Sequence, residues 1–418
     1  MKLVQEIKAF ILCLSICCCI ANVGHAQNKN LNYYITTALA NSPLLKDFNN
    51  QLISNTIDSQ KLRATYKPQI SGIASNSLAP VLQGFGYDPA LSNIASFTEV
   101  VNVNKTFVGK KNITEQSRSF TILNDSVKIA QKLTEQELKR SITTQYLTTY
   151  GDWQQLNFNT DIIKLLKNQE EILRKLTESN IYRQTDYLTF LVTLKQQELQ
   201  LKQLNIQFRN NLSTLNYLAG IFDTTLVELD APEIKLEQLP NARSSSWFMH
   251  YINDNLAMVN NLNILNYNYK PKFSTFANAG YSSSFLYQAY KNFGFSVGIN
   301  LVVPIYDGHQ KQMLQHKIAL AQNTNTTYRD YFTTQYNQQI AMLRQQLSGT
   351  ESLINDINEQ IKYADGLIEA NNKLLETGDA RIPDLVIAIN NYLSAKNLLT
   401  QNNISRMQII TQLNYWNR

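Results

Sequence analysis

Residues 293–303 of the chain read Phe-Gly-Phe-Ser-Val-Gly-Ile-Asn-Leu-Val-Val. Large apolar side chains alternate there with mostly small or polar ones, and this two-residue period is typical of a β-strand whose faces meet different environments. One face of the predicted strand therefore contacts an apolar environment, and the other contacts water. A strand of a soluble β-sandwich alternates in the same way, so the rest of the chain has to distinguish the two cases.

The chain offers too few strands for a sandwich. Strand patterns occur at about 69–79, 97–107, 272–285 and 293–304, and so small a sheet has no second sheet to pack against. The candidate strands have the ~9–11 residues of a transmembrane β-strand. Four strands cannot close a barrel, and lipid does not tolerate open edges. We therefore expect several copies of the chain to build one transmembrane β-barrel together.

Aromatic residues indicate where a lipid boundary would lie. They gather at the loop between the last two strands, at Tyr281, Phe285, Tyr287, Tyr290 and Phe293. Aromatic girdles of this kind lie at the membrane interfaces of β-barrels.

The sequence contains an internal duplication. The tripeptide Tyr-Lys-Pro occurs at 66–68 and again at 269–271, and the run 176–186 matches 374–384 without a gap. Several matches in the same order indicate a repeat. The predicted parts are a signal peptide (1–26), a first repeat (27–220), a linker or equatorial segment (221–246) and a second repeat (247–418).

Each repeat is expected to contain a helix, two strands, a very long helix, a turn and a returning helix. The long helix, turn and returning helix are predicted at 110–175, 176–185 and 186–220 in the first repeat, and at 310–375, 376–383 and 384–416 in the second. Each long helix would span ~100 Å at 1.5 Å per residue. Apolar residues at three-four spacing predict coiled-coil packing of these helices.

The helix that opens each repeat has its own signature. The first is predicted over Leu31–Thr65, with a break at Ser42-Pro43, where serine can cap a helix and proline can open one. Only about sixteen residues separate Asn255 from Pro271, where about twenty-six separate Ser42 from Pro68. The helix before the second strand pair is therefore expected to be shorter than its counterpart by over two turns. The chain also stops almost at the end of its last helix, which leaves no C-terminal tail.

The N-terminus reads as a secretory signal. All four cysteines, at positions 13, 17, 18 and 19, lie in an apolar stretch that follows two lysines, and Gly24-His25-Ala26 predicts cleavage before Gln27. A membrane anchor, which needs ~20 apolar residues, and lipidation at Cys17 are the alternatives. A mature chain without thiols would have no disulfide, thiolate metal site or cysteine nucleophile.

Composition excludes several classes of protein. Charged residues are only 17% of the chain, whereas asparagine and glutamine make up roughly a fifth of it, far above ordinary usage. No run of ~18 apolar residues follows the leader, which excludes a polytopic helical membrane protein. The net charge of +6 is dispersed, so we expect no nucleic-acid partner.

Catalytic and metal sites are not expected either. The chain has only four histidines, and the pair His309 and His316 lacks a third ligand, so no metal, cofactor or catalytic residue is predicted.

With these elements in place, the sequence resembles the TolC-like outer-membrane efflux proteins. The resemblance runs from Leu31 to Trp416, and its most specific parts are the duplicated order of elements, the strand-to-helix passage 301–308 and the turn 376–385. It implies an α+β fold in a homotrimer, in which four strands per protomer form a twelve-stranded transmembrane β-barrel that is continuous with a long coiled-coil α-helical barrel. It also implies a location in the outer membrane of a Gram-negative cell, extending into the periplasm.

The resemblance implies a channel-tunnel that exports drugs or other toxic small molecules. Its partners would be outer-membrane lipid, a periplasmic adaptor protein and an inner-membrane transporter of RND or ABC type. The outer-membrane duct of a type I protein secretion system uses the same component, and a non-channel periplasmic coiled-coil protein is a further alternative. A hydrolase on a helical scaffold is disfavoured by the few histidines and the absence of cysteine from the predicted mature chain.

In this family the helix turns form the gate at the periplasmic end. Acidic residues often follow the turn; Asp384 occupies the first such position, but Ile387 occupies the second, which argues against strong cation selectivity. Asp186 is the equivalent residue of the first repeat, and Arg381 or Arg183 could pair with it across the closed end, each exposed pair contributing ~0–1 kcal/mol. The alternative role of Asp384 is to stabilise the helix start. The residues expected to contact the adaptor are Glu178, Ser179, Asn180, Thr377, Gly378 and Asp379.

Overall fold

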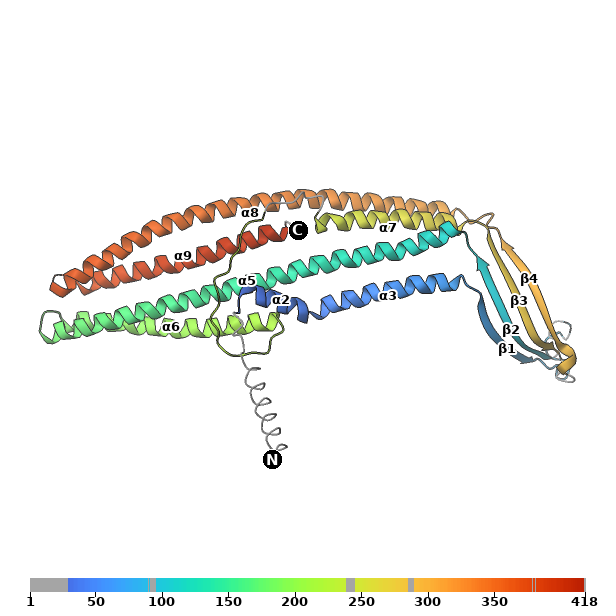
Figure 1. Ribbon diagram of the computed structural model, residues 1–418, viewed down its shortest axis with the longest axis horizontal. Helices are drawn as coiled ribbons and strands as arrows, with labels where there is room; N and C mark the ends of the chain where they lie inside the picture. The colour runs from blue at the N-terminus through green and yellow to red at the C-terminus, as the bar shows by residue number, and fades with distance from the viewer. Residues whose placement is uncertain are drawn as a thin grey trace, which may run out of the picture. The chain divides into compact units, whose positions relative to one another are not determined.

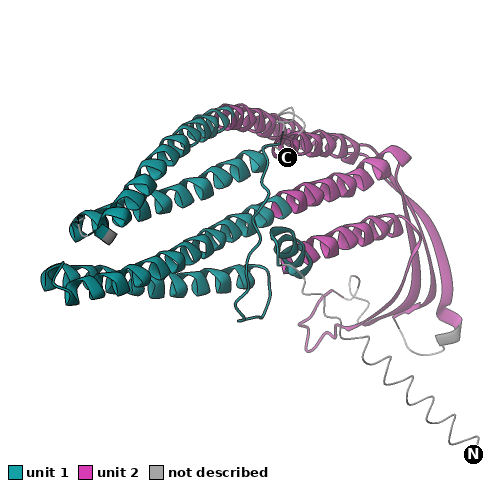
Figure 2. Ribbon diagram, turned by 60° about the vertical axis from the view of Figure 1, so that its left-hand side comes forward, with its two compact units in different colours: residues 1–42, 135–239, 337–418 teal, residues 43–134, 240–336 magenta. Residues whose placement is uncertain are grey.

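The computed structural model describes residues 29–88, 90, 95–237, 245–284, 289–377, 379 and 381–416. The predicted signal peptide and its cysteines lie outside the described residues, as do Phe285, Tyr287 and the side chain of Tyr290 from the aromatic cluster. Contacts divide the chain into two compact units: unit 1 comprises 1–42, 135–239 and 337–418, and unit 2 comprises 43–134 and 240–336 (Figure 2). Both predicted repeats therefore contribute to both units, because the long helix of each repeat belongs partly to one unit and partly to the other.

Unit 2 contains one antiparallel sheet of four strands in the order β1-β2-β3-β4 (Figure 1). The strands are β1 (Gln69–Leu78), β2 (Ala95–Phe107), β3 (Lys272–Ser283) and β4 (Phe293–Val302), and their ends differ from the predicted ones by no more than two residues. The central pair, β2 and β3, joins the two repeats. Its register places Phe107 opposite Phe273, with the ring centroids 5.4 Å apart.

One face of β4 carries uncovered apolar side chains. Phe295, Val297 and Ile299 are 84%, 73% and 74% exposed, although this alternating pattern is normally buried on one side. The outer edges of β1 and β4 also have no neighbouring strand within the described sheet. Exposed apolar faces and open strand edges of this kind are typical of surfaces that contact another molecule.

Two glycines are required by close packing inside the sheet. Gly280 of β3 lies against the backbone of Glu99 and Val100, where a methyl group would clash with a carbonyl oxygen. Gly298 of β4 leaves room for the ring of Phe276 directly across the strand pair. The aromatic ring thus covers a position that has no side chain.

The helices that precede the two strand pairs have equal length. Helix α3 (Pro43–Thr65) and helix α7 (Ser246–Asn268) each contain 23 residues, so the predicted shortening of the helix in the second repeat is wrong. The prediction failed because α7 begins at Ser246, well before Asn255, directly after an extended residue at Ser245. Its first turn is held by Phe248, whose ring lies 5.4 Å from that of Phe332.

Asparagines join α7 to α5 within unit 2. The amide of Asn253 donates to the Ile122 carbonyl oxygen (3.1 Å) and to the Ser126 hydroxyl (2.6 Å), and that of Asn260 donates to the Ser119 hydroxyl (2.8 Å). Both asparagines are buried. Part of the amide excess is therefore used in helix packing, and it does not serve only as polar surface.

Unit 1 is helical. Helix α2 (Leu31–Asn41) is capped by Asn30, whose side-chain oxygen accepts the Tyr33 N–H at 2.9 Å. It ends before Ser42, and α3 starts at Pro43, as the sequence indicates. The remaining helices of this unit, two of which begin in unit 2, are α5 (Lys110–Glu178), α6 (Gln184–Leu218), α8 (Gln310–Thr377) and α9 (Ile382–Trp416). None of the helices in the described part of the chain has an apolar stretch long enough to cross a membrane.

The core of unit 1 near its linker contains apolar residues of α5 and α6 at three-four spacing. Ile142 and Tyr146 of α5 pack with Phe208 and Leu212 of α6. The linker joins the same cluster through Leu229, which is buried. The Tyr146 hydroxyl also donates to the Asp230 carbonyl oxygen at 2.7 Å. Residues 221–237 are therefore folded onto the helices.

Candidate functional site

The first helix turn is closed by a Schellman motif. Asn180 has a positive φ of 60°, and its N–H donates to the Thr177 carbonyl oxygen at 3.0 Å. The next N–H, of Ile181, reaches back to the Leu176 carbonyl oxygen at 2.9 Å. These are the two bonds that satisfy the last carbonyls of a helix, and asparagine is one of the few residues that tolerates the left-handed conformation they need. The backbone of the turn is therefore fully specified by local bonds.

The second turn has a counterpart of the bond between Ile181 and Leu176. The Asp379 N–H donates to the Leu374 carbonyl oxygen at 2.9 Å, and the Thr377 hydroxyl donates to the Asp379 carboxylate at 2.9 Å. Gly378, which was expected to contact an adaptor, lies outside the described residues. Its sequence position matches that of Asn180, so both repeats place a residue that tolerates positive φ at the same point.

An apolar cluster holds the two turns side by side in unit 1. It combines Leu173 of α5, Phe190 of α6, Leu375 of α8 and Leu385 of α9, all of them fully buried. Both turns lie at one end of the unit in Figure 1. Burial and the nearby charge of Asp379 also raise the pKa of Tyr182, so a side chain of the first turn senses a charge of the second.

Arg381 and Asp384, both predicted gate residues, form an ion pair with each other at the start of α9. The Arg381 guanidinium donates to both carboxylate oxygens of Asp384, at 3.1 and 3.2 Å. The Asp384 N–H in turn donates to the Arg381 carbonyl oxygen at 2.9 Å. Asp384 thus sits in the first turn of α9, where its negative charge favours the exposed helix amides. Within one protomer this arrangement matches the helix-start role.

The equivalent residues of the first repeat behave differently. Arg183 precedes α6 and Asp186 lies in its first turn, yet these two described side chains form no ion pair. Ile387 is exposed on α9, one turn after Asp384. The second position of the family's acidic pattern therefore presents an apolar side chain to solvent within the protomer.

Sequence reasoning missed a hydrogen bond between helices at the first turn. The Tyr187 hydroxyl of α6 donates to the Glu170 carboxylate of α5 at 2.5 Å, and this bond raises the pKa of Tyr187. The sequence alone gives no sign of this bond, because the contacts across a helical hairpin depend on the rotation of each helix. The second repeat has Ile368 and Leu385 at the matching positions, and both are buried. At these matching positions, the helices of the first hairpin are thus joined by a hydrogen bond, whereas the second hairpin has apolar packing.

Farther from the turns, α5 carries a buried acid. Asp152 accepts hydrogen bonds from the side-chain amides of Gln207 (2.7 Å) and Asn211 (2.5 Å) of α6. It lines a cleft whose other polar side chains are amides and hydroxyls, among them Gln155, Thr400 and Gln401. Burial raises the pKa of Asp152, although the two amide bonds act in the opposite direction.

Asp152 should make stability depend on pH. Its pKa is raised on folding, so the folded protein holds the proton more tightly, and stability falls as pH rises from the unfolded pKa through the folded one. Replacing it by asparagine removes this loss. We expect the melting temperature of Asp152→Asn, relative to wild type, to increase as the pH rises above the ordinary aspartate pKa of about 3.9. A difference that stays constant or shrinks as the pH rises would contradict the assignment.

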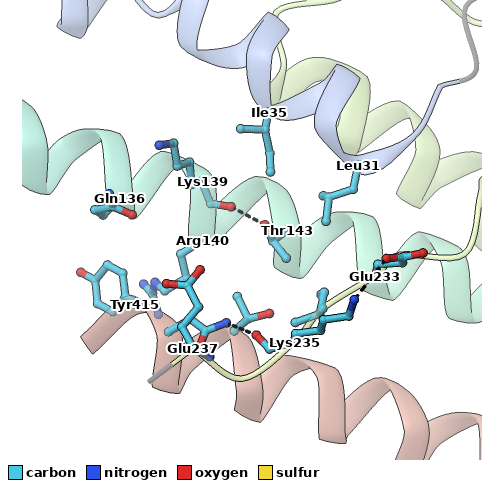
Figure 3. Close-up of a pocket in the computed structure, with 13 residues that line it drawn as sticks. Leu31, Ile35, Gln136, Lys139, Arg140, Thr143, Glu233, Lys235, Glu237 and Tyr415 are labelled. Atoms are coloured by element: carbon cyan, nitrogen blue, oxygen red, sulfur yellow. Dashed lines mark hydrogen bonds and ion pairs between the residues drawn. The ribbon is translucent and has the colours of Figure 1, made fainter. Parts of the chain in front are cut away.

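A second pocket of unit 1 lies between α2, α5, the linker and α9 (Figure 3). Arg140 donates to Glu137 at 2.6 and 3.1 Å and lies 4.8 Å from the centroid of the Tyr415 ring. Burial and a hydrogen bond to Glu137 raise the pKa of Tyr415 to about 12. Beside it, Asn414 donates to the Lys235 carbonyl oxygen at 2.8 Å. This hydrogen bond joins the linker to the last helix.

No cluster of three potential metal ligands occurs among the described residues.

No known family model and no curated protein sequence matches the chain. Solved structures do. The chain is similar to CusC, a protein studied for transmembrane channel formation, at 12% identity and a TM-score of 0.78, over 93% of this chain and 92% of that one. It is also similar to the outer-membrane protein VceC of Vibrio cholerae (14% identity, TM-score 0.74, 93% and 96% covered). A third similar structure is the outer-membrane channel CmeC of Campylobacter jejuni (13% identity, TM-score 0.73), over 93% of this chain and 85% of that one. The chain therefore has the fold of these three proteins, and the resemblance to TolC-like proteins is confirmed at the level of the fold.

Proposed function

We propose that the protein is an outer-membrane channel that exports solutes from the cell as the outer component of a tripartite efflux system. The observation that carries this proposal is the uncovered apolar face of β4 on a four-stranded sheet with two open edges. Lipid can cover such an apolar face. A sheet in lipid must close into a barrel, because its backbone polar groups cannot be left unpaired there. The fold shared with outer-membrane channels supports the same conclusion.

The proposed assembly is a homotrimer. Four strands from each protomer close a twelve-stranded barrel when the β4 edge of one copy pairs with the β1 edge of the next. This pairing removes both exposed edges at once. The long helices α5 and α8, with 69 and 68 residues, then form the wall of a periplasmic conduit.

The turns are the proposed gate and docking end. They are the exposed ends of two hairpins held by one apolar cluster, so a periplasmic adaptor can engage Glu178, Ser179, Asn180, Thr377 and Asp379 there. An inner-membrane transporter of RND or ABC type would supply the energy. Nothing in the described residues calls for a cofactor in this passive role.

A type I protein secretion duct is the second candidate, because it would use the same outer component. The neighbouring genes separate the two: a proton-driven pump indicates efflux, and an ABC transporter beside a secreted protein indicates secretion. A non-channel periplasmic protein is disfavoured because a solvated sheet would not leave Phe295, Val297 and Ile299 exposed.

Fractionation and bilayer recordings test the proposal directly. We expect the protein in the outer-membrane fraction, migrating as a heat-modifiable trimer in gels, and we expect discrete conductance steps when it is added to planar bilayers. A soluble periplasmic protein without conductance would contradict it.

The gate role of Asp384 has its own test. In the trimer the Asp384 carboxylates would form a ring near the closed end, partly neutralised by Arg381. We expect Asp384→Ala to weaken the block of single-channel current by divalent cations by about tenfold, which corresponds to ~1.4 kcal/mol of lost attraction. Asp161→Ala, another aspartate of a solvent-exposed ion pair, serves as the control. Unchanged cation block would leave Asp384 with its helix-start role alone.

A further inference from the structure

Helix α6 exposes an apolar stripe on the side opposite its buried face. Its members, Leu188, Val192, Leu199 and Ile206, are 51–67% exposed, and the last three repeat every seven residues, which is the spacing of a coiled-coil seam. The buried residues of the same helix, such as Phe190 and Leu204, point into the core of unit 1. The stripe is therefore a second packing face that nothing in the described part of the protomer covers.

Cations follow one edge of this stripe. Lys195, Lys202 and Arg209 also recur every seven residues, beside Val192, Leu199 and Ile206. Lys195 pairs with Glu198 at 2.8 Å, and Arg209 donates to the Asn205 side chain at 2.8 Å. Lys202 has no ion-pair partner among the described residues. We call this surface, 188–209, the basic stripe.

Helix α8 exposes a stripe of the same kind near its C-terminal end. Leu353, Tyr363, Leu367 and Leu374 are 43–74% exposed, while Ile357, Ala364 and Ile368 lie buried on an adjacent face. Asp356 and Glu359 flank the exposed residues, and neither has an ion-pair partner in the described part of the chain. We call this surface, 353–374, the acidic stripe.

The two stripes start at the same level of unit 1. Leu188 lies one turn after the beginning of α6, and Leu374 lies one turn before the end of α8. The helices run in opposite directions from adjacent turns. Leu199 is consequently level with Tyr363, and Lys202 is level with Glu359, while Asp356 lies between the levels of Lys202 and Arg209. Apolar residues match apolar residues, and charges of opposite sign match each other.

We propose that the basic stripe of one protomer packs against the acidic stripe of a second copy of this chain. The contact is heterologous, because the two stripes are different surfaces, and a heterologous contact about an axis along the helices closes into a ring. This inference rests on the proposed homotrimer and adds the helix pair that seals its helical wall. The charge complementarity of the two stripes favours a second copy over an unrelated partner helix.

Thiol crosslinking tests this pairing on a clean background, because all four cysteines lie within residues 13–19. The full chain is expressed behind a cysteine-free export signal with Leu199→Cys and Tyr363→Cys together, and intact cells are treated with a short bismaleimide. We expect covalent dimers and trimers from the double variant. Either single variant should give none, since a heterologous contact never brings two copies of one stripe together.

Charge reversal provides an independent measurement. We expect Lys202→Glu alone to lower the crosslinking yield of the double-cysteine chain severalfold, and Glu359→Lys added to it to restore the yield. Reversing Lys164, which lies on α5 outside both stripes, is the control.

The failure of this inference is distinguishable from failure of the proposed function. If the protein still forms heat-modifiable trimers without crosslinker, but the thiol introduced at position 199 neither crosslinks nor is protected from maleimide, the pairing is wrong and the channel stands. If no trimer forms in any variant with native folding by circular dichroism, the proposed assembly itself is wrong.

Discussion

Replacing Gly280 by alanine should abolish the outer-membrane assembly that we propose for this protein. The new methyl group would lie well inside the van der Waals contact distance of the Glu99 carbonyl oxygen and the Val100 backbone, with no flexible side chain to move aside. Gly280 also has a φ of 156° that is uncommon for residues with a side chain. A clash with the backbone of the neighbouring strand cannot relax without breaking the β2–β3 ladder, so we expect a cost of about 3 kcal/mol or more.

Gly294 is the matched control. It lies directly opposite Gly280 in the β3–β4 register, yet a methyl group there meets nothing within 4 Å. We expect Gly294→Ala to form heat-modifiable trimers at the wild-type level, while Gly280→Ala remains monomeric or is degraded. Equal trimer yields for the two variants would show that the close approach at Gly280 is not a real constraint.

A charge on the apolar face of β4 should be nearly as damaging. Ile299 belongs to this face, and arginine on a lipid-facing strand position costs ~2–4 kcal/mol near the bilayer midplane. We therefore expect Ile299→Arg to reduce the outer-membrane level of the protein strongly and to suppress conductance in bilayers.

The adjacent residue supplies the comparison. Asn300 points to the other face of the same strand, which the proposed function assigns to the aqueous lumen. Asn300→Arg should assemble normally and change only the conductance and ion preference of the channel. If the two variants were equally abundant in the outer membrane, the apolar face would not face lipid, and the proposed function would fail.

Local patterns in the sequence predicted most of the fold. The alternation in 293–303 identifies β4 because successive side chains of a strand point to opposite faces. Ser42-Pro43 marks the α2–α3 boundary because helix capping depends only on neighbouring residues. The predicted second repeat begins at 247, one residue after Ser246, but the full length of α7 was not predicted. Its N-terminal serines resemble a polar linker, and only the packing of Phe248 against Phe332 shows that the helix has already begun.

The sequence predicted where the two turns of the candidate site lie in the chain, but not which side chains contact each other there. The match between 176–186 and 374–384 located both turns, yet it could not show that Arg381 binds Asp384 at the start of its own helix, because that bond depends on how the chain enters α9. The bond between Tyr187 and Glu170 was missed for another reason. The second repeat has only apolar residues at the matching positions, so a comparison of the repeats does not indicate it. Partners across helices depend on rotation of each helix, which a single sequence does not fix.

The seam between β2 and β3 carries a consequence for biogenesis. The β1–β2 and β3–β4 pairs are local hairpins, but the seam joins residues such as Phe107 and Phe273 from different halves of the chain. Distant pairings wait for the closure of a long loop and are formed late. Because the chain is made from its N-terminal end, the first hairpin would be present before its partner has arrived, with apolar side chains unprotected. The interval between the two hairpins is therefore the stage at which a chaperone is most needed and at which aggregation competes with folding.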